Sequence, residues 1–157
     1  MVQDEQDFEV VFYNPNIRPV DEYFKRLEEN RKLCEKHNVP FIVLEYDNDR
    51  WNKTIAGLEK EPERGRRCDV CFYMRIKRVM EYAKENGFEA VASVLGVSRY
   101  KDLAQVNRAA RKASDETGFP YIEIEGRKDG MQERRNNLIK ELDLYSQDYC
   151  GCVFSKL

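Results

Sequence analysis

The alternation of short apolar runs with amphipathic segments is the feature that most restricts the fold of this chain. The runs at residues 9–13, 40–46, 88–95 and 121–124 are rich in β-branched and aromatic residues and predict strands. Between them lie segments whose apolar residues recur at helical spacing. Strands that alternate with helices pair in parallel, so the sequence predicts an α/β fold with a parallel sheet flanked by helices.

Turn and capping residues set the expected helix boundaries. Pro19 and Asp21 open the first helix, which extends to about His37, and Gly87 is a C-terminal stop for the third. The expected helices cover residues 21–37, 49–58, 69–86, 102–117 and 130–142, with a charged loop at 59–67. The residues expected to face the core are Phe24, Leu27, Leu33 and Cys34, then Phe72, Ile76, Val79, Met80 and Ala83, then Leu103, Val106, Ala110 and Ala113.

The length and composition fit one globular domain that spans residues 1–157. The chain has 41% apolar and 36% charged residues, and no apolar run approaches the roughly 20 residues of a membrane helix. The first nine residues are acidic, which argues against a signal or transit peptide. We therefore expect a cytoplasmic protein with no membrane partner.

Cysteine usage is the most unusual feature of the composition. Of five cysteines, four form the close pairs Cys68-x-x-Cys71 and Cys150-x-Cys152, and Cys34 stands alone. Cytosolic proteins rarely use structural disulfides, and close cysteine pairs in them more often bind metal or perform redox chemistry. Cys34 falls on the apolar stripe of its helix and is expected to fill the core.

The Cys68 and Cys71 pair lies at the start of an expected helix, where a spacing of three directs both sulfurs to one side. The helix N-terminus and nearby cations favour thiolates, the metal-binding and nucleophilic form. The pair fits an iron–sulfur cluster, half of a zinc site or a redox dithiol; two cysteines packed as small apolar groups are the alternative. The nearby cations, which form either a phosphate-binding cluster or a solvated helix face, are Arg64, Arg66, Arg67, Arg75, Lys77 and Arg78.

The Cys150 and Cys152 pair flanks a single glycine near the C-terminus. A disulfide between them closes a small, strained ring that reduces easily. This favours a redox-active pair over a structural disulfide, with incidental cysteines in a frayed tail as the alternative.

The remaining candidates carry weaker signals. His37, the only histidine, is expected to place a charge at a helix C-terminus, and no Ser–His–Asp triad or phosphate-binding glycine loop is recognisable. Aromatic residues next to polar loops can stack on unpaired RNA bases, although ordinary half-buried packing is the better interpretation of each. These aromatics are Tyr13, Trp51, Tyr100, Tyr145 and Tyr149.

Taken in order, several motifs over residues 9–154 resemble the QueH-type epoxyqueuosine reductases. The shared motifs are Phe12-Tyr13-Asn14-Pro15-Asn16-Ile17, Tyr23 with Lys25-Arg26-Leu27, Trp51 with Gly57-Leu58-Glu59-Lys60-Glu61-Pro62, Arg67-Cys68-Asp69-Val70-Cys71-Phe72, Ser98-Arg99-Tyr100-Lys101-Asp102, Arg127-Lys128-Asp129-Gly130, and Leu144-Tyr145-Ser146-Gln147-Asp148-Tyr149-Cys150-Gly151-Cys152.

The resemblance implies a Rossmann-like α/β fold related to the adenine nucleotide alpha hydrolases. It implies reduction of the epoxide of epoxyqueuosine in tRNA to queuosine, the last step of tRNA queuosine biosynthesis, with an electron donor as a further partner. The cofactor it implies is a 4Fe–4S cluster, and an additional iron could act as a Lewis acid. Cys68 and Cys71 match the family's cluster ligands, and Cys150 and Cys152 match its redox-active pair.

One part of the family pattern has no match in this sequence. Family members begin with a strand and a His-x-Cys-Cys-Ala-Pro-Cys type segment, whose adjacent cysteines supply the other two cluster ligands. We therefore expect the fold to lack its first strand. The alternatives to an active reductase are a tRNA-binding module stabilised by zinc on the four paired cysteines, and an inactive truncated homologue. The reductase and the zinc module both require the four sulfurs to converge on one pocket.

Overall fold

Two β-α-β units organise the described part of the molecule. In the computed structural model, which describes residues 8–95, 102–123 and 149–156, the first unit runs through β1 (Val10–Phe12), α1 (Val20–Lys36) and β2 (Phe41–Val43). Its two strands pair in parallel, with Val10 opposite Phe41. A parallel pair needs a long crossover between its strands, and α1 provides it.

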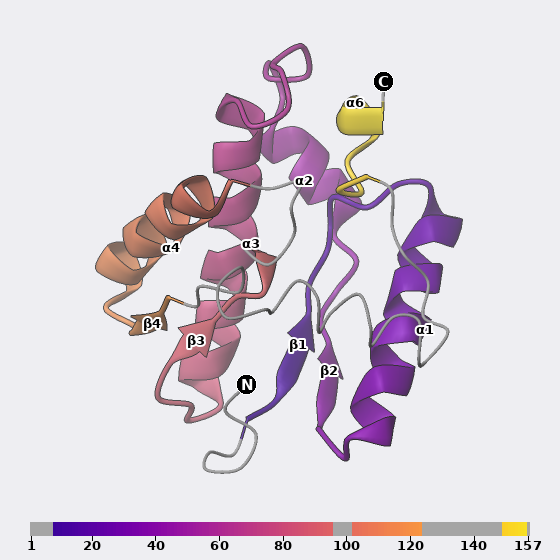
Figure 1. The fold of residues 1–157 in the computed structure, drawn as a ribbon. Helices are drawn as coiled ribbons and strands as arrows, with labels where there is room; N and C mark the ends of the chain where they lie inside the picture. Colours follow the sequence, from indigo (N-terminus) through magenta and orange to yellow (C-terminus); the bar gives the residue numbers. More distant parts are fainter. Residues whose placement is uncertain (1–7, 96–101, 124–148, 157) are drawn as a thin grey trace.

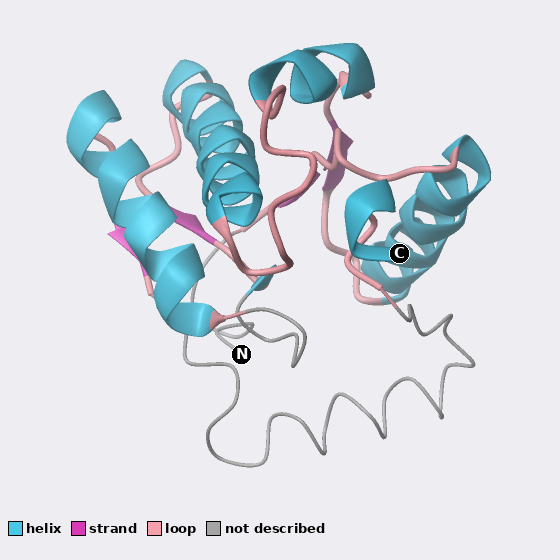
Figure 2. Cartoon of the chain, turned by 90° about the horizontal axis from the view of Figure 1, so that it is seen from above, coloured by secondary structure: helices cyan, strands magenta, loops and turns pink. Residues whose placement is uncertain are grey.

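The second unit repeats this arrangement with β3 (Val91–Ala92), α4 (Leu103–Thr117) and β4 (Tyr121–Ile122). Its strands are also parallel, with Val91 opposite Tyr121. Figure 1 shows the strands in the order β4, β3, β1, β2 across the molecule, and Figure 2 shows α3 and α4 side by side, away from α1. The prediction of parallel strands flanked by helices is confirmed.

The described strands form two small parallel sheets. In the described part of the chain, β1 pairs only with β2, and β3 only with β4. Sheet strands must approach to about 4.8 Å to share hydrogen bonds, and no described strand links β1 to β3. The long helix α3 (Arg66–Glu85) connects the two units instead. It packs on β3 and α4, and its Tyr82 hydroxyl bonds the Glu9 carboxylate beside β1.

The largest core cluster lies where α3 packs against α4. The α3 stripe of Phe72, Ile76, Met80 and Ala83 is buried as predicted, and it meets the small inward face of α4. Alanines at positions 109, 110 and 113 let the two helices approach closely. A second cluster joins β1 to α1, where Phe12 packs edge-on against Tyr23 at a centroid distance of 5.4 Å.

Two predictions about the core of α1 had different outcomes. Cys34 is buried, as expected of a core residue, and burial raises the pKa of its thiol. Phe24, which was expected to face the core, is instead 55% exposed. It neighbours Tyr23, which fills the inward position and stacks on Tyr46 with ring centroids 3.9 Å apart. His37 lies at the C-cap of α1, where it was predicted, and is exposed.

Most element boundaries agree with the predictions to within a few residues, and α3 is the informative exception. It begins at Arg66 and not at Asp69, because Gly65 in extended backbone serves as its N-cap and accepts from the backbone N–H groups of Cys68 and Asp69. Cys68 is therefore already inside the helix. Two short helices complete the described part: α2 (Asn48–Thr54), which begins one residue before the predicted 49–58 helix begins and ends four residues before it ends, and α6 (Val153–Lys156), which the sequence pattern did not predict.

Several predictions fall outside the described residues. They are the helix at 130–142, the motifs at 98–101, 127–130 and 144–148, and the aromatics Tyr100 and Tyr145. Among the described helices, none combines the length and the apolar character needed to span a membrane.

Candidate functional site

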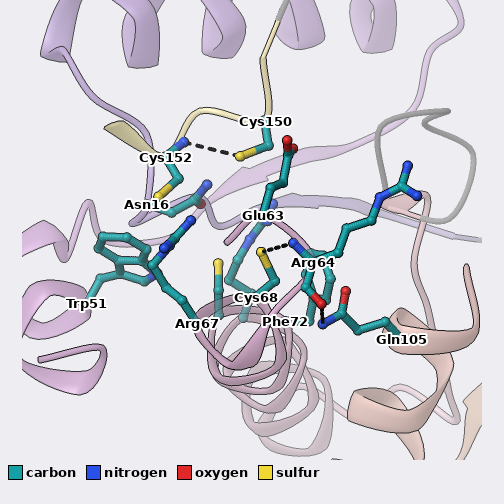
Figure 3. A pocket seen from close by; sticks show the side chains of 12 residues that line it. Asn16, Trp51, Glu63, Arg64, Arg67, Cys68, Phe72, Gln105, Cys150 and Cys152 are labelled. Carbon is teal, nitrogen blue, oxygen red and sulfur yellow. Dashed lines mark hydrogen bonds between the residues drawn. The ribbon is translucent and has the colours of Figure 1, made fainter. Parts of the chain in front are cut away.

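A pocket lies beyond the carboxyl end of β1, where parallel α/β proteins commonly bind ligands. Its wall is formed by the loop after β1, by α2, by the first turns of α3 and α4, and by the segment that precedes α6 (Figure 3). The lining residues are Asn16, Trp51, Glu63, Arg64, Arg67, Cys68, Cys71, Phe72, Arg75, Gln105, Cys150 and Cys152.

All four paired cysteines line this pocket. Cys68 and Cys71 approach it from α3, and Cys150 and Cys152 approach it from the C-terminal segment. Cys71 and Cys152 also belong to one buried cluster with Trp51. In Figure 3 the sulfur atoms of Cys150 and Cys68 lie on two sides of the pocket and are directed into it. The convergence of residues about 80 positions apart, which both the reductase and the zinc interpretations required, is therefore present.

The first turn of α3 sets the environment of the Cys68 thiol. The backbone N–H of Arg64 donates to its Sγ at 3.3 Å, and the guanidinium of Arg67 lies near enough to favour the thiolate. Burial outweighs both effects and raises the pKa of Cys68 to about 11, with Cys71 and Cys150 adding to the rise. The Arg67 guanidinium favours the thiolate, as expected of a nearby cation, but desolvation exceeds this attraction and holds the pKa of the Cys68 thiol above its ordinary value.

The cysteine arrangement gives a test of the metal predictions. The helical spacing of Cys68 and Cys71 offers two thiols from one helix face, which suits two ligands of a larger metal centre. Across the described ranges, no three histidine, cysteine or acidic side chains come together closely enough to hold a metal ion. The described residues therefore fit a pair of cluster ligands, and they give no support to a closed zinc site made from all four cysteines.

The Cys150 and Cys152 thiols occupy an irregular segment, and both are free. The backbone N–H of Cys152 donates to Cys150 Sγ at 3.5 Å. Cys152 is only 4% exposed, and burial raises its thiol pKa. Gly151 between them has a φ of +109°, a conformation that side-chain-bearing residues rarely adopt. The segment can thus bring two thiols together without a helix or strand around it.

Two buried polar residues shape the floor of the pocket: Arg67, one of the cations expected near Cys68, and Gln105, which the sequence did not single out. Arg67 is 1% exposed, and its Nη1 donates to the carbonyls of Leu58, Glu59 and Glu61, which fixes the loop before α3. Gln105, in the first turn of α4, donates through Nε2 to the carbonyls of Arg64 and Gly65 and to Asp69 Oδ1. Arg67 therefore orders the loop before α3, and Gln105 connects the start of α4 to the start of α3.

Three buried side chains on the pocket wall each carry an unsatisfied polar atom. The Oδ1 of Asn16, the Nε1–H of Trp51 and the Oε1 of Gln105 have no hydrogen-bond partner among the described residues. Each residue is 2% exposed or less. Leaving such a group unsatisfied costs about 1–3 kcal/mol, so the wall is prepared for a ligand that offers both hydrogen-bond donors and acceptors. No local sequence pattern identifies these atoms, since their burial depends on contacts between distant elements.

The cation cluster of residues 64–78 divides into two groups. Arg67 and Arg75 are buried, and Arg75 bonds Asn14 Oδ1, so neither can bind phosphate at the surface. Arg66 is on the exposed face and pairs with Glu61 at 3.7 Å, while Arg78 pairs with Glu45 at 3.0 Å. Neither original interpretation describes the whole cluster, because part of it is scaffold and part is surface.

The aromatic candidates in the described ranges serve as packing residues. Tyr13, Trp51 and Tyr149 are 4%, 1% and 9% exposed, which leaves no open ring face for a stacked RNA base. Trp51 stacks on Phe154 with ring centroids 6.4 Å apart. The packing interpretation is confirmed for these three residues.

Comparison with known proteins gives a consistent result. The family model described as "Epoxyqueuosine reductase QueH" matches residues 1–157. Proteins with that same name are similar to this chain: one from Acinetobacter baylyi is 47% identical over 150 residues, one from Histophilus somni 46% over 153, and one from Haemophilus influenzae 44% over 153. Each alignment covers 95% of this chain and, respectively, 69%, 62% and 61% of the relative. The chain thus spans less than two thirds of the length of two of these three relatives.

Proposed function

The chain belongs to the epoxyqueuosine reductase QueH family, and from that premise we propose that it reduces the epoxide of epoxyqueuosine in tRNA to give queuosine. The observation that carries the proposal is the meeting of two cysteine pairs at one pocket. A reductase needs an electron-pair source beside its substrate, and this pocket is where the described chain gathers four thiols.

The Cys150 and Cys152 thiols are the proposed source of the electron pair. Deoxygenation of an epoxide takes two electrons and two protons: both C–O bonds break, a C=C bond forms, and the oxygen leaves as water. Two thiols supply these two electrons and two protons, because their S–H bonds break as one S–S bond forms. An electron donor then returns the disulfide to the dithiol. The spacing of the two cysteines by a single glycine, with both at the pocket, supports this role.

We propose Cys68 and Cys71 as two ligands of a 4Fe–4S cluster. The family membership motivates the cluster, and the position of both thiols on one helix face at the pocket supports the pair. When bound, such a cluster relays single electrons. Metal ligation requires thiolates, so binding must displace the proton that burial holds on the Cys68 thiol. The described residues single out no ligand set for an additional iron.

The polar wall is the proposed recognition surface for the modified base. Asn16 and Gln105 present carbonyl oxygens as acceptors, and Trp51 presents an indole N–H as a donor. A modified base carries hydrogen-bond groups of both kinds, and the anticodon loop displays it without a pairing partner. Arg64, an exposed residue of the pocket lining, is positioned for a tRNA phosphate, and the exposed Arg66 at the start of α3 adds positive charge nearby.

The test is turnover of epoxyqueuosine in tRNA by anaerobically purified protein that has been reconstituted with iron and sulfide. We expect queuosine to appear in nucleoside digests and to require a reductant. tRNA that lacks epoxyqueuosine is the control. A folded, iron-loaded protein that leaves epoxyqueuosine unchanged under reducing conditions contradicts the proposal. A colourless protein that contains zinc and binds tRNA without turnover supports the binding-module alternative instead.

A further inference from the structure

One buried arginine of α1 holds the backbone of the segment that carries the Cys150 and Cys152 thiols. Arg26 donates from Nη2 to the carbonyl of Tyr149 at 2.8 Å and from Nη1 to the carbonyl of Cys150 at 3.0 Å. These contacts join residues more than 120 positions apart in the chain. Two consecutive carbonyls of an irregular segment are thereby fixed by one planar, permanently charged group.

The arginine is itself held rigidly. Its Nε donates to Glu22 Oε1 one helical turn earlier at 2.8 Å, and the two side chains are 7% and 11% exposed. The guanidinium carbon also lies 5.0 Å from the ring centroid of Tyr149. A charge this deeply buried is costly unless it is paired and hydrogen-bonded. Glu22 and the two carbonyls satisfy that requirement, so Arg26 has little freedom to turn away.

Gly151, between the two cysteines, is held by the segment that precedes α1. The backbone N–H of Arg18 donates to the carbonyl of Gly151 at 2.9 Å. A Cβ at position 151 would lie 2.9 Å from Arg26 Nη1 and 2.8 Å from Ile17 Cγ1. The carbonyls of three successive residues, 149 to 151, are therefore bonded in a geometry in which both thiols are free.

We propose that Arg26 is a positioning residue that holds the segment 149–152 in its dithiol geometry and so keeps the Cys150–Cys152 disulfide easy to reduce. This inference rests on the proposed function, because it concerns the same redox pair. Oxidation converts two S–H groups to one S–S bond and gives up two electrons and two protons to a disulfide oxidant. Closing the small ring requires the backbone around Gly151 to change, and this works against the hydrogen bonds that Arg26 makes.

The test measures the dithiol–disulfide equilibrium of the full chain in glutathione redox buffers, without substrate. Alkylation followed by mass spectrometry of the peptide that contains both cysteines gives the ratio. For Arg26→Gln we expect a shift toward the disulfide of about tenfold, equivalent to a potential roughly 30 mV more negative. For Arg26→Lys, which keeps the charge but not the planar fork, we expect about threefold. Arg31→Gln is the matched control, since Arg31 lies on the same helix in an exposed pair with Glu28.

Circular dichroism and urea unfolding establish which variants are folded. If Arg26→Gln fails to fold, Arg26→Lys and Glu22→Gln decide the question, because Glu22→Gln loosens the arginine and leaves its carbonyl contacts possible. Folded Arg26 variants that match Arg31→Gln overturn the inference. Failure of the wild-type pair to form a disulfide at any buffer ratio removes the redox role in the proposed function. If the disulfide forms in wild type and its equilibrium with the dithiol is the same in every variant, only the role of Arg26 is removed.

Discussion

The two cysteine pairs reach the same pocket by different physical means. Cys68 and Cys71 are placed by α3, whose geometry is local: a glycine N-cap, an amphipathic stripe and a spacing of three are enough to direct both thiols to one side. Cys150 and Cys152 lie in backbone without regular structure and owe their position to Arg26 and to the N–H of Arg18. One pair is rigid because its own helix is rigid, and the other because distant elements hold it.

This difference matches what each proposed role demands. Cluster ligands must keep a fixed spacing, which a helix provides. A dithiol that alternates with a disulfide must change its backbone at each cycle, which a helix resists and an externally held loop with a central glycine allows. We therefore propose that the helical pair holds the metal and that the pair in the C-terminal segment exchanges the electron pair.

Substitution of the cysteines has the largest expected effect and tests this assignment directly. For Cys150→Ser and for Cys152→Ser we expect turnover to fall by more than about 10³-fold, to background, because one thiol cannot deliver an electron pair. The iron content after reconstitution is expected to stay at the wild-type level. For Cys68→Ser and Cys71→Ser we expect both iron and turnover to be lost.

Iron analysis beside the tRNA assay separates these outcomes, and Cys34→Ala is the control because Cys34 is buried in α1, away from the pocket. Loss of iron in the Cys150 and Cys152 variants contradicts the assignment, since it makes all four cysteines ligands. Retention of iron in the Cys68 and Cys71 variants contradicts it equally.

The neighbouring arginines at the start of α3 give the second test, which concerns the rigidity of the helical pair. Arg67 is buried and bonds three loop carbonyls, whereas the side chain of Arg66 is 76% exposed. For Arg67→Leu we expect the free energy of unfolding to fall by about 3 kcal/mol, because buried carbonyls lose their donor. For Arg66→Leu we expect a change within about 0.5 kcal/mol. Urea unfolding of the metal-free protein measures both; equal losses would show that the loop carbonyls find other donors.

The helical half of the molecule was predictable from the sequence because its signals are local. The α3 stripe and the helical placement of Cys68 and Cys71 follow from apolar spacing and turn residues within one helix, and the parallel pairing follows from the alternation of strands with helices. The early start of α3 was missed because Gly65 caps the helix through backbone groups alone. In the sequence, a glycine at this position is equally typical of a loop. Phe24 was placed inward because Tyr23 and Phe24 both fit the stripe to within one position.

The chemistry of the site was less predictable because it depends on burial and on long-range contacts. Counting cations near Cys68 predicted an ionised thiol, but counting charges ignores desolvation, which decides the outcome here. Arg26 appears in the sequence as an ordinary helix-surface residue, and only the fold brings it to the carbonyl of Cys150. The roles of the four cysteines were proposed from family resemblance and stay predictions, which the substitutions above can decide.

The smallest expected effect comes from the pH dependence that burial of Cys68 imposes on stability. Its thiol has a pKa of about 11 in the folded protein, against an ordinary value of 9.0. Between these values the unfolded chain loses the proton and the folded chain keeps it, so deprotonation favours the unfolded state. Stability contributed by the neutral thiol is therefore fully present below pH 9 and is lost as the pH rises toward 11.

Wild-type protein and the variant Cys68→Ala should accordingly diverge in metal-free alkaline buffer. We expect wild type to lose about 1 kcal/mol more unfolding free energy than the variant between pH 9 and 11, a value discounted because the thiol is partly open to solvent. Taking the difference between the two proteins cancels the titration of tyrosines and lysines over the same range. Parallel pH profiles would mean that Arg67 and the helix N-terminus offset the burial after all. Cys68 would then keep the ordinary pKa of a thiol, and the contrast with the C-terminal pair would rest on backbone geometry alone.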